Sequence, residues 1–373
     1  MTHTAMIAKI CTAAPVIPVL TIDRVEDAQP LARALVAGGL PALEITLRTD
    51  AAMEAIAAVA EVEGALAGVG TLLTTAQIRA LETADLNNLS SDNLRALTTG
   101  QVAALGTDQV STLTSAQLNS LDEDQLAAIE TADVAALSAN QLASLASASV
   151  ALLSTDQIAA LGTAQVAALT TAQAKALTTD LIESITTDQV KALTSAQLNA
   201  LASTQVGAIE TEDLAAMTTS QIAKLASATV AMLSTDDADG KSQIQALTTT
   251  QVAALSTAQV NLGLSTAQVA VMETRDIAAL STANLAALST AQVNLGLTTT
   301  QVVQGLTTAQ LQSLTTDQVA ALSTAQVQLG LTTAQLRQGL STTQVAAMET
   351  QDVAALSTTQ IAALGTAQVN LGL

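Results

Sequence analysis

The sequence predicts a two-part chain: an α/β segment with three parallel β-strands over residues 1–72, followed by a mostly α solenoid of very short capped helices. Three observations predict this architecture. Apolar β-branched runs alternate with helical patterns as far as residue 72. An eight-residue pattern then repeats to residue 373. Each repeat also opens with a helix-capping signal, so each is expected to form its own short helix.

The first 72 residues read as alternating strands and helices. β-Branched and apolar runs predict strands over residues 15–22, 41–49 and 65–72. Between them, residues 25–39 and 50–64 carry helical spacing and end at glycine. Strands that alternate with helices pair in parallel through β-α-β crossovers. We therefore expect one small parallel sheet with two covering helices.

Four motifs in this segment occur together and in order. They are Pro15-Val16-Ile17-Pro18-Val19, the run from Pro30 to Gly39, Leu43-Glu44-Ile45-Thr46-Leu47-Arg48-Thr49, and Gly68-Val69-Gly70-Thr71. The segment resembles the N-terminal third of the bacterial 2-keto-3-deoxy-6-phosphogluconate (KDPG) aldolases, also called KDPG/KHG aldolases. The resemblance implies a partial TIM barrel.

The resemblance also implies an activity and three site residues. The family is a class I aldolase that cleaves its keto acid phosphate to pyruvate and glyceraldehyde 3-phosphate through a lysine Schiff base. Glu44 matches the family's general acid/base, Arg48 the residue that holds a substrate carboxylate or phosphate, and Thr71 a residue of the pyruvate site. All three fall at carboxyl ends of predicted strands, where barrel active sites lie. The alternative interpretation is that Glu44 and Arg48 form only an ion pair.

The nucleophile of that chemistry is missing from the sequence. The family's Schiff-base lysine lies in a phenylalanine-rich strand, and this chain has no Phe. After residue 72 its lysines are Lys175, Lys191, Lys224 and Lys241, all in repeat or linker sequence. Three strands cannot close a barrel of eight. We therefore expect a catalytically incomplete segment in which Glu44 is vestigial. A class I aldolase that acts on a keto acid substrate is the alternative.

From Leu73 the chain follows the octad Leu-[Ser/Thr]-Thr-x-Gln-[Val/Ile/Leu]-x-Ala, whose positions are numbered 1 to 8 below. Octads fill residues 73–233 and resume over residues 247–373, where some units have nine residues. An irregular linker is expected over residues 234–246. Ser/Thr at position 2 and Gln at position 5 form the capping box, in which the hydroxyl and the Gln side chain each satisfy a free backbone N–H.

The octad favours many short helices over one long helix. Eight residues advance an apolar stripe by about 80° per repeat on a continuous helix, so the stripe would wind around it. A β-solenoid of Thr/Val ladders is the alternative, although Ala and Gln favour helix. In the nine-residue units six glycines are expected to end the helices as C′ residues. These are Gly263, Gly296, Gly305, Gly330, Gly339 and Gly372.

Composition excludes several classes of function. The net charge of −20 opposes binding to nucleic-acid phosphates and to anionic membranes. With His3 as the only histidine and Cys11 as the only cysteine, a Ser-His-Asp triad, a His-based metal site and an intrachain disulfide are not expected. Asp237-Ala238-Asp239-Gly240 resembles the middle of a calcium loop, but position 12 of such a loop is Ala246. No metal or cofactor is expected.

No apolar run reaches the ~18 residues that a membrane span requires, and the first residues make a poor signal peptide. We expect a cytoplasmic protein, with a fragment of a bacterial surface repeat protein as the alternative. The sequence ends on Asn370-Leu371-Gly372-Leu373 without a polar cap. Solenoids need capped ends, so self-association through the repeat ends is expected.

Overall fold

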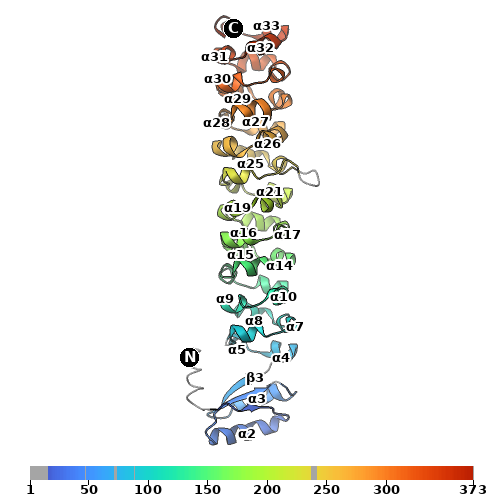
Figure 1. Ribbon diagram of the computed structural model, residues 1–373, viewed down its shortest axis with the longest axis vertical. Helices are drawn as coiled ribbons and strands as arrows, with labels where there is room; N and C mark the ends of the chain where they lie inside the picture. The colour runs from blue at the N-terminus through green and yellow to red at the C-terminus, as the bar shows by residue number, and fades with distance from the viewer. Residues whose placement is uncertain (1–15, 47, 71–73, 88, 237–241, 373) are drawn as a thin grey trace. The chain divides into compact units, whose positions relative to one another are not determined.

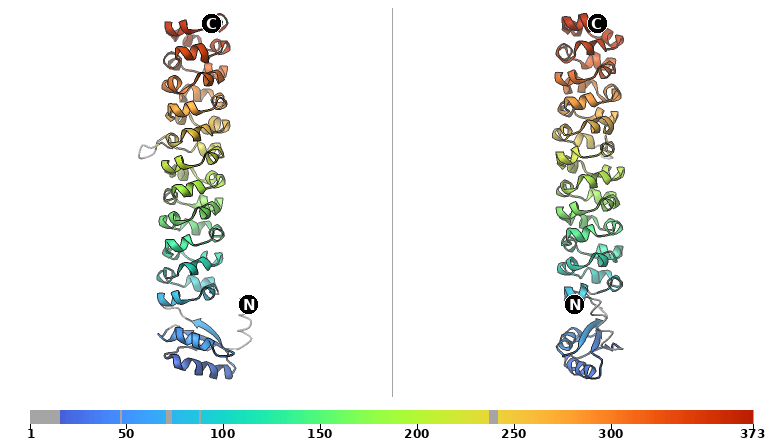
Figure 2. Two further views of the ribbon diagram at one scale, coloured as in Figure 1. Left: turned by 180° about the vertical axis from the view of Figure 1, so that it is seen from behind. Right: turned by 90° about the vertical axis from the view of Figure 1, so that its left-hand side faces the viewer.

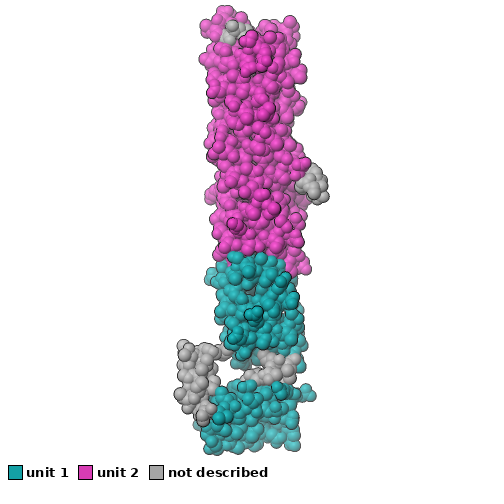
Figure 3. Space-filling model, in the orientation of Figure 1, with its two compact units in different colours: residues 1–153 teal, residues 154–373 magenta. Residues whose placement is uncertain are grey.

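The computed structural model describes residues 16–46, 48–70, 74–87, 89–236 and 242–372. It divides the chain into two compact units, Met1–Leu153 and Ser154–Leu373 (Figure 3). Unit 1 contains the β/α segment and the first octads. Unit 2 contains octads alone.

The β/α segment is a three-stranded parallel sheet with two helices. Its elements are β1 (Val19–Leu20), α2 (Val25–Ala37), β2 (Ala42–Thr46), α3 (Ala52–Ala60) and β3 (Leu66–Gly70), and the strand order is β1-β2-β3 (Figure 1). Each strand returns beside its predecessor through one helix, as the alternating pattern predicts. The predicted α/β segment is confirmed, although β1 is shorter than the run over residues 15–22.

Both helices pack on the same face of this sheet. Leu43 and Ile45 of β2 are almost fully buried against Ala28 of α2 and against Ala55 and Val59 of α3. Alanine on the helix faces lets the helices approach the sheet and each other closely. The chain turns back to the next strand at Gly39 and Gly64, whose φ values are 84° and 86°. Residues with a Cβ rarely adopt this backbone region, so glycine is required at both turns.

In the described residues, the octads of unit 1 form ten short helices. They are α4 (Thr75–Ala80), α5 (Thr83–Asn87), α6 (Ser91–Arg95), α7 (Thr99–Val102), α8 (Thr107–Thr112), α9 (Ser115–Leu118), α10 (Glu123–Ala128), α11 (Thr131–Ala135), α12 (Ala139–Ala143) and α13 (Ser147–Ala151).

Unit 2 continues the series with α-helices and with five short π-helices, labelled η. They are α14 (Thr155–Ala160), α15 (Thr163–Ala168), α16 (Thr171–Ala176), α17 (Thr179–Glu183), α18 (Thr187–Ala192), α19 (Ser195–Ala200), α20 (Ser203–Gly207), α21 (Thr211–Ala216), α22 (Thr219–Ala223), α23 (Ser227–Val230), α24 (Gln243–Ala246), α25 (Thr249–Ala253), η1 (Gln259–Gly263), α26 (Thr266–Val271), α27 (Thr274–Ala279), α28 (Thr282–Ala287), η2 (Gln292–Gly296), η3 (Gln301–Gly305), α29 (Thr308–Ser313), α30 (Thr316–Ala320), η4 (Gln326–Gly330), η5 (Gln335–Gly339), α31 (Thr342–Ala346), α32 (Thr350–Ala355), α33 (Thr358–Ala363) and α34 (Thr366–Gly372).

Within each unit, a helix packs against the third helix along the chain. Examples are α4 with α7 and α8 with α11 in unit 1, and α16 with α19 and α27 with η3 in unit 2. Figure 2 shows the short helices of each unit lying in successive layers. Three octads therefore make one turn of the coil. The predicted α-solenoid of short helices is confirmed. Among the described residues, strands occur only in the β/α segment, so the β-solenoid alternative is wrong.

Each octad contributes two apolar side chains to the interior. Position 6 and the next position 1 are three residues apart, so they lie on the same side of the short helix. In α15 these residues are Val166 and Leu169, which are 2% and 5% exposed. The remaining positions face outward or carry the caps. Within the described ranges, no helix combines the length and apolar character that a bilayer crossing requires.

Of the segment over residues 234–246, where an irregular linker is expected, the structure describes residues 234–236 and 242–246. Residues 243–246 form α24, which packs against α21 and α26 as an ordinary third neighbour. Ser234 N–H donates to Gln243 Oε1 at 3.0 Å, and Gln243 N–H donates to Ser234 Oγ at 3.4 Å. These are the two bonds of a capping box, here between residues nine apart instead of three. The segment is therefore one octad with six extra residues between its cap and its Gln.

The glycines of the nine-residue units do not act as C′ residues. Among the described glycines, only Gly39 and Gly64 have positive φ. The ninth residue instead produces a π-turn, in which Leu264 N–H donates to Gln259 O at 3.0 Å. A Cβ on Gly263 would lie 3.0 Å from Ser227 O and 3.1 Å from Val230 Cβ. Glycine is thus required here because a neighbouring helix lies so close.

We predict that Gly263→Ala destabilises the array by roughly 1–3 kcal/mol, because the added methyl overpacks against α23. The matched control is Gly207→Ala in α20. A Cβ there meets no atom within 4 Å, so the substitution is expected to stabilise by about 0.5–1 kcal/mol through helix propensity. Thermal unfolding of both variants checks the prediction. Equal changes in the two midpoints would contradict it.

Candidate functional site

The structure describes two of the three site residues that the resemblance implies. Glu44 is half-buried in β2, with its backbone N–H donating to Pro18 O at 3.0 Å. Arg48 is exposed, two residues beyond the end of β2. Both residues are described, and no ion pair or side-chain hydrogen bond joins them, so the ion-pair interpretation is wrong. Thr71 lies outside the described residues.

The carboxyl end of the sheet is held by threonine hydroxyls. Thr46 Oγ1 donates to Leu20 O at 3.1 Å and lies 3.0 Å from Thr21 Oγ1. Thr49 Oγ1 also donates to the carbonyl of Ile22. These bonds join the ends of β1 and β2 across the position where the family resemblance places an active site. They fix the backbone there and carry no charge.

The described part of the chain places no lysine near Glu44. Residues 16–70 contain no lysine in the sequence. Lys175, Lys191 and Lys224 are exposed in unit 2, the first two at position 7 of their octads and Lys224 at position 8. Lys241 lies outside the described residues. A Schiff base requires an amine next to the acid/base group, and the described residues of unit 1 contain no lysine.

The repeats share a set of hydrogen bonds made by the Gln side chain at position 5. In the octad of α18, Gln189 Oε1 accepts the N–H of Thr186 at 2.8 Å, which is the predicted capping box. Its Nε2 donates to Ile158 O at 2.8 Å and to Leu161 O at 2.7 Å. Those carbonyls lie 31 and 28 residues earlier, at the carboxyl end of another helix. One side chain therefore caps two helices.

Other Gln side chains at position 5 make the same two hydrogen bonds to the end of an earlier helix. Gln197, Gln205 and Gln221 each donate to the carbonyls 31 and 28 residues earlier. Each of these side chains is at least 93% buried. For Gln243 the separations are 37 and 34, because the six extra residues intervene. The capping-box pattern did not reveal these bonds, since they depend on the three-octad turn.

We predict that Gln189→Glu destabilises the array by roughly 2–4 kcal/mol. The variant keeps the acceptor for Thr186 but loses the donor to two buried carbonyls and adds a buried charge. Gln328→Glu, at an exposed position 7, adds the same charge without that loss. The measurement is the urea midpoint of each variant at neutral pH. The interpretation fails if the two variants lose similar stability.

Five octads depart from the pattern in a coordinated way. Each has Glu at position 2 and Asp at position 5, so both halves of the capping box change together. The aspartates are Asp85, Asp133, Asp213, Asp276 and Asp352. Four of them are at least 95% buried, and Asp85 is exposed. Sequence reasoning missed this class, although the paired change from Ser/Thr-x-x-Gln to Glu-x-x-Asp is visible in the sequence.

Each buried aspartate of this class has a threonine partner. Thr107 Oγ1 donates to Asp133 Oδ1 at 2.6 Å, and Thr324 Oγ1 donates to Asp352 Oδ1 at the same distance. Each threonine occupies position 3 of the octad three units earlier. The partner of each acid is therefore set by the same three-octad turn that sets the Gln bonds.

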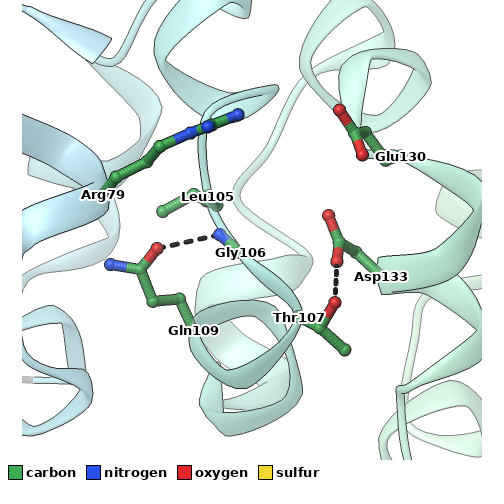
Figure 4. Close-up of a pocket in the computed structure, with 7 residues that line it drawn as sticks. All are labelled: Arg79, Leu105, Gly106, Thr107, Gln109, Glu130 and Asp133. Carbon is green, nitrogen blue, oxygen red and sulfur yellow. Dashed lines mark hydrogen bonds between the residues drawn. The ribbon is translucent and has the colours of Figure 1, made fainter. Parts of the chain in front are cut away.

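A pocket of about 340 Å³ adjoins one of these octads in unit 1 (Figure 4). Its lining residues are Arg79, Leu105, Gly106, Thr107, Gln109, Glu130 and Asp133. Asp is shorter than Gln, and Gly106 has no side chain, which leaves the space open. Arg79 Nε donates to Ala104 O at 3.3 Å. Among the described residues, no group of three His, Cys, Asp or Glu side chains could hold a metal ion.

The structure thus defines a β/α segment joined to an α-solenoid of capped octads. Comparison with known proteins finds a match for each part. Residues 7–104 match the family of KDPG and KHG aldolases. Residues 126–163, 206–238, 269–304, 303–329 and 345–371 match the ALTTAQ repeat. The resemblance inferred from the four motifs is confirmed, and the aldolase match continues for 32 residues beyond residue 72.

Curated relatives of the first segment are aldolases. The 2-dehydro-3-deoxy-phosphogluconate aldolase of Zymomonas mobilis is 46% identical over 90 residues, which is 24% of this chain and 43% of that protein. The KHG/KDPG aldolase of Escherichia coli K12 is 47% identical over 76 residues, 20% of this chain and 36% of that protein. The chain therefore spans less than half the length of these relatives.

A solved structure also matches. It is the crystal structure of the 2-keto-3-deoxy-6-phosphogluconate aldolase of Zymomonas mobilis ZM4 with 3-phosphoglycerate, 37% identical in sequence. The match covers 29% of this chain and 50% of that chain, with a TM-score of 0.19.

Proposed function

We propose that the chain is a catalytically incomplete KDPG-aldolase-like segment joined to a solenoid with a structural or interaction role. The observation that carries the proposal is the third-neighbour packing of octad helices in both units. The octads bury their apolar positions in one another and bond through their Gln side chains, so they form an architecture complete in itself. Among the described residues, no strand beyond β1, β2 and β3 is present to extend the sheet toward a barrel.

The proposed loss of activity rests on the lack of a lysine among the described residues of unit 1, which contains Glu44. Glu44 lies in β2, whereas the described lysines are exposed on octads of unit 2. Acid/base catalysis by a carboxylate on a Schiff base requires contact between the two groups, or a single bridging water. The named relatives are aldolases, and the present segment retains under half of their length.

The proposed interaction role rests on the surface that the octads present. Position 4 is exposed and position 7 is exposed or half-buried, and both vary among the repeats. Residues 73–373 carry 8 Lys or Arg against 24 Asp or Glu. An acidic surface of this kind attracts basic partners at long range and repels polyanions. The proposed partner class is therefore a basic protein surface.

We predict that pyruvate and borohydride leave the intact mass of the full chain unchanged. Borohydride reduces a lysine–pyruvate Schiff base to a stable adduct, and the described residues of unit 1 contain no lysine to form one with Glu44. A complete KDPG aldolase treated in parallel is the positive control. A stoichiometric adduct on this chain would overturn the proposal and favour the alternative, a class I aldolase that cleaves KDPG.

A further inference from the structure

Two buried acids in unit 2 each have one carboxylate oxygen without a hydrogen-bond partner. Asp276 of α27 is 1% exposed. Its Oδ1 accepts the hydroxyl of Thr249 at 2.9 Å, and its Oδ2 is buried without a hydrogen-bond partner. Asp352 has the same arrangement, with Thr324 on Oδ1 and a buried Oδ2 without a partner. A buried polar atom left in this state carries a full desolvation penalty.

The repeat shows what normally occupies this position. At position 5, Gln supplies an amide N–H to the position-1 carbonyl three octads earlier, as Gln292 does to Leu264 O at 2.5 Å. For Asp276 the equivalent carbonyl belongs to Leu247. Among the described residues, no donor reaches that carbonyl. A carboxylate is an acceptor only, so an ionised Asp276 cannot form a hydrogen bond with the Leu247 carbonyl, which is also an acceptor.

The neighbouring octad shows that a side chain of this length reaches far enough. Asn284 occupies position 5 of the next unit, and its Nδ2 donates to Leu255 O at 2.8 Å. Leu255 stands in the same relation to Asn284 as Leu247 does to Asp276. Asn and Asp have the same shape and differ in the donor. A proton on Asp276 Oδ2 would therefore complete the bond that Asn284 makes.

We propose that Asp276 binds a proton in the folded array, and that its Oδ2–H donates to the Leu247 carbonyl in place of the glutamine amide. The bond is the one that the repeat requires at this position. Its donor depends on pH, whereas the donor of a glutamine does not. The Glu-x-x-Asp octad of α27 therefore makes this hydrogen bond only with a bound proton, whereas a Gln at position 5 carries its amide donor at every pH.

The surroundings of Asp276 favour the neutral form. Burial raises the pKa of its carboxyl, the Thr249 hydrogen bond and Arg275 lower it, and Glu273 raises it. Arg275 is held mainly by Glu273, with Nε–Oε2 at 2.7 Å against 3.9 Å to Asp276 Oδ1. The elements packed against α27 are α25 and η3, and neither carries a titratable side chain.

The raised folded-state pKa sets the direction of the pH dependence. The stabilisation from the proton is complete below the ordinary pKa of an aspartate. It is lost as the pH rises through the raised pKa of the folded chain. The remaining carboxylates of the chain also titrate, so the contribution of Asp276 must be isolated by comparison with a matched variant.

The test is Asp276→Asn in the full chain, which fixes the donor at every pH. Thermal midpoints are measured from about pH 3.5 to about pH 9 for the wild type and the variant. We expect equal midpoints at the acidic end. As the pH rises above the ordinary aspartate range, the variant should become more stable by roughly 2–4 °C. Asp317→Asn, at an exposed position 4, removes the same charge and should show no such divergence.

Two further measurements decide the proposal. The ¹³C shift of the Asp276 carboxyl reports its protonation directly, and titration at or below the ordinary aspartate range would overturn the proposal. A difference in midpoint that is constant with pH would also overturn it. Calcium chloride added at neutral pH tests a cation as the occupant. A stabilisation of the wild type that is absent from Asp276→Asn would show that a cation, not a proton, fills the site.

Discussion

The solenoid depends on the glutamine at position 5 of each octad. The first four N–H groups and the last four C=O groups of any helix lack partners within it. In a helix of four to seven residues these groups make up most of the backbone. The Gln oxygen accepts an N–H at the start of its own helix, and the Gln amide reaches the last carbonyls of a helix in another turn. Since both groups are on one buried side chain, the end of one helix positions the start of another.

This arrangement explains why the array needs no aromatic residue. Each octad buries only one position-6 side chain and one leucine-like side chain, and the hydrogen bonds supply the remaining specificity. A misplaced turn would leave a buried amide and two buried carbonyls unpaired, each at a cost of about 1–3 kcal/mol. Register is therefore fixed by polar groups in the interior, and the apolar residues can vary among Val, Ile, Leu and Met.

The features within one octad could be predicted from the sequence. The capping box, the buried pair at positions 1 and 6 and the parallel β/α segment depend on residues close in the chain. The partners of Gln189, Asp276 and Gly263 depend on the three-octad turn, which results from packing and has no local signal. Gly263 shows the difference well. A glycine near a helix end predicts a C′ residue by local rules, yet its actual requirement is the contact with Ser227 and Val230 in the preceding turn.

The candidate site shows a similar limit. Motifs located Glu44 correctly in β2, but strand position alone could not reveal that Thr46 and Thr49 bind the neighbouring strand end. The family match extends past residue 72 into octads that the structure places in the solenoid. Sequence similarity and packing therefore divide the chain at different points.

The octad of Ser234 and Gln243 shows how such an array can acquire new surface. Six residues enter between the two halves of a capping box, yet α24 keeps its neighbours and its Gln keeps its two carbonyls. Position 3 is therefore a place where length can be added without shifting the register of later turns. Evolution or protein engineering could therefore insert a binding loop at position 3 of a chosen octad without changing the packing of the later turns.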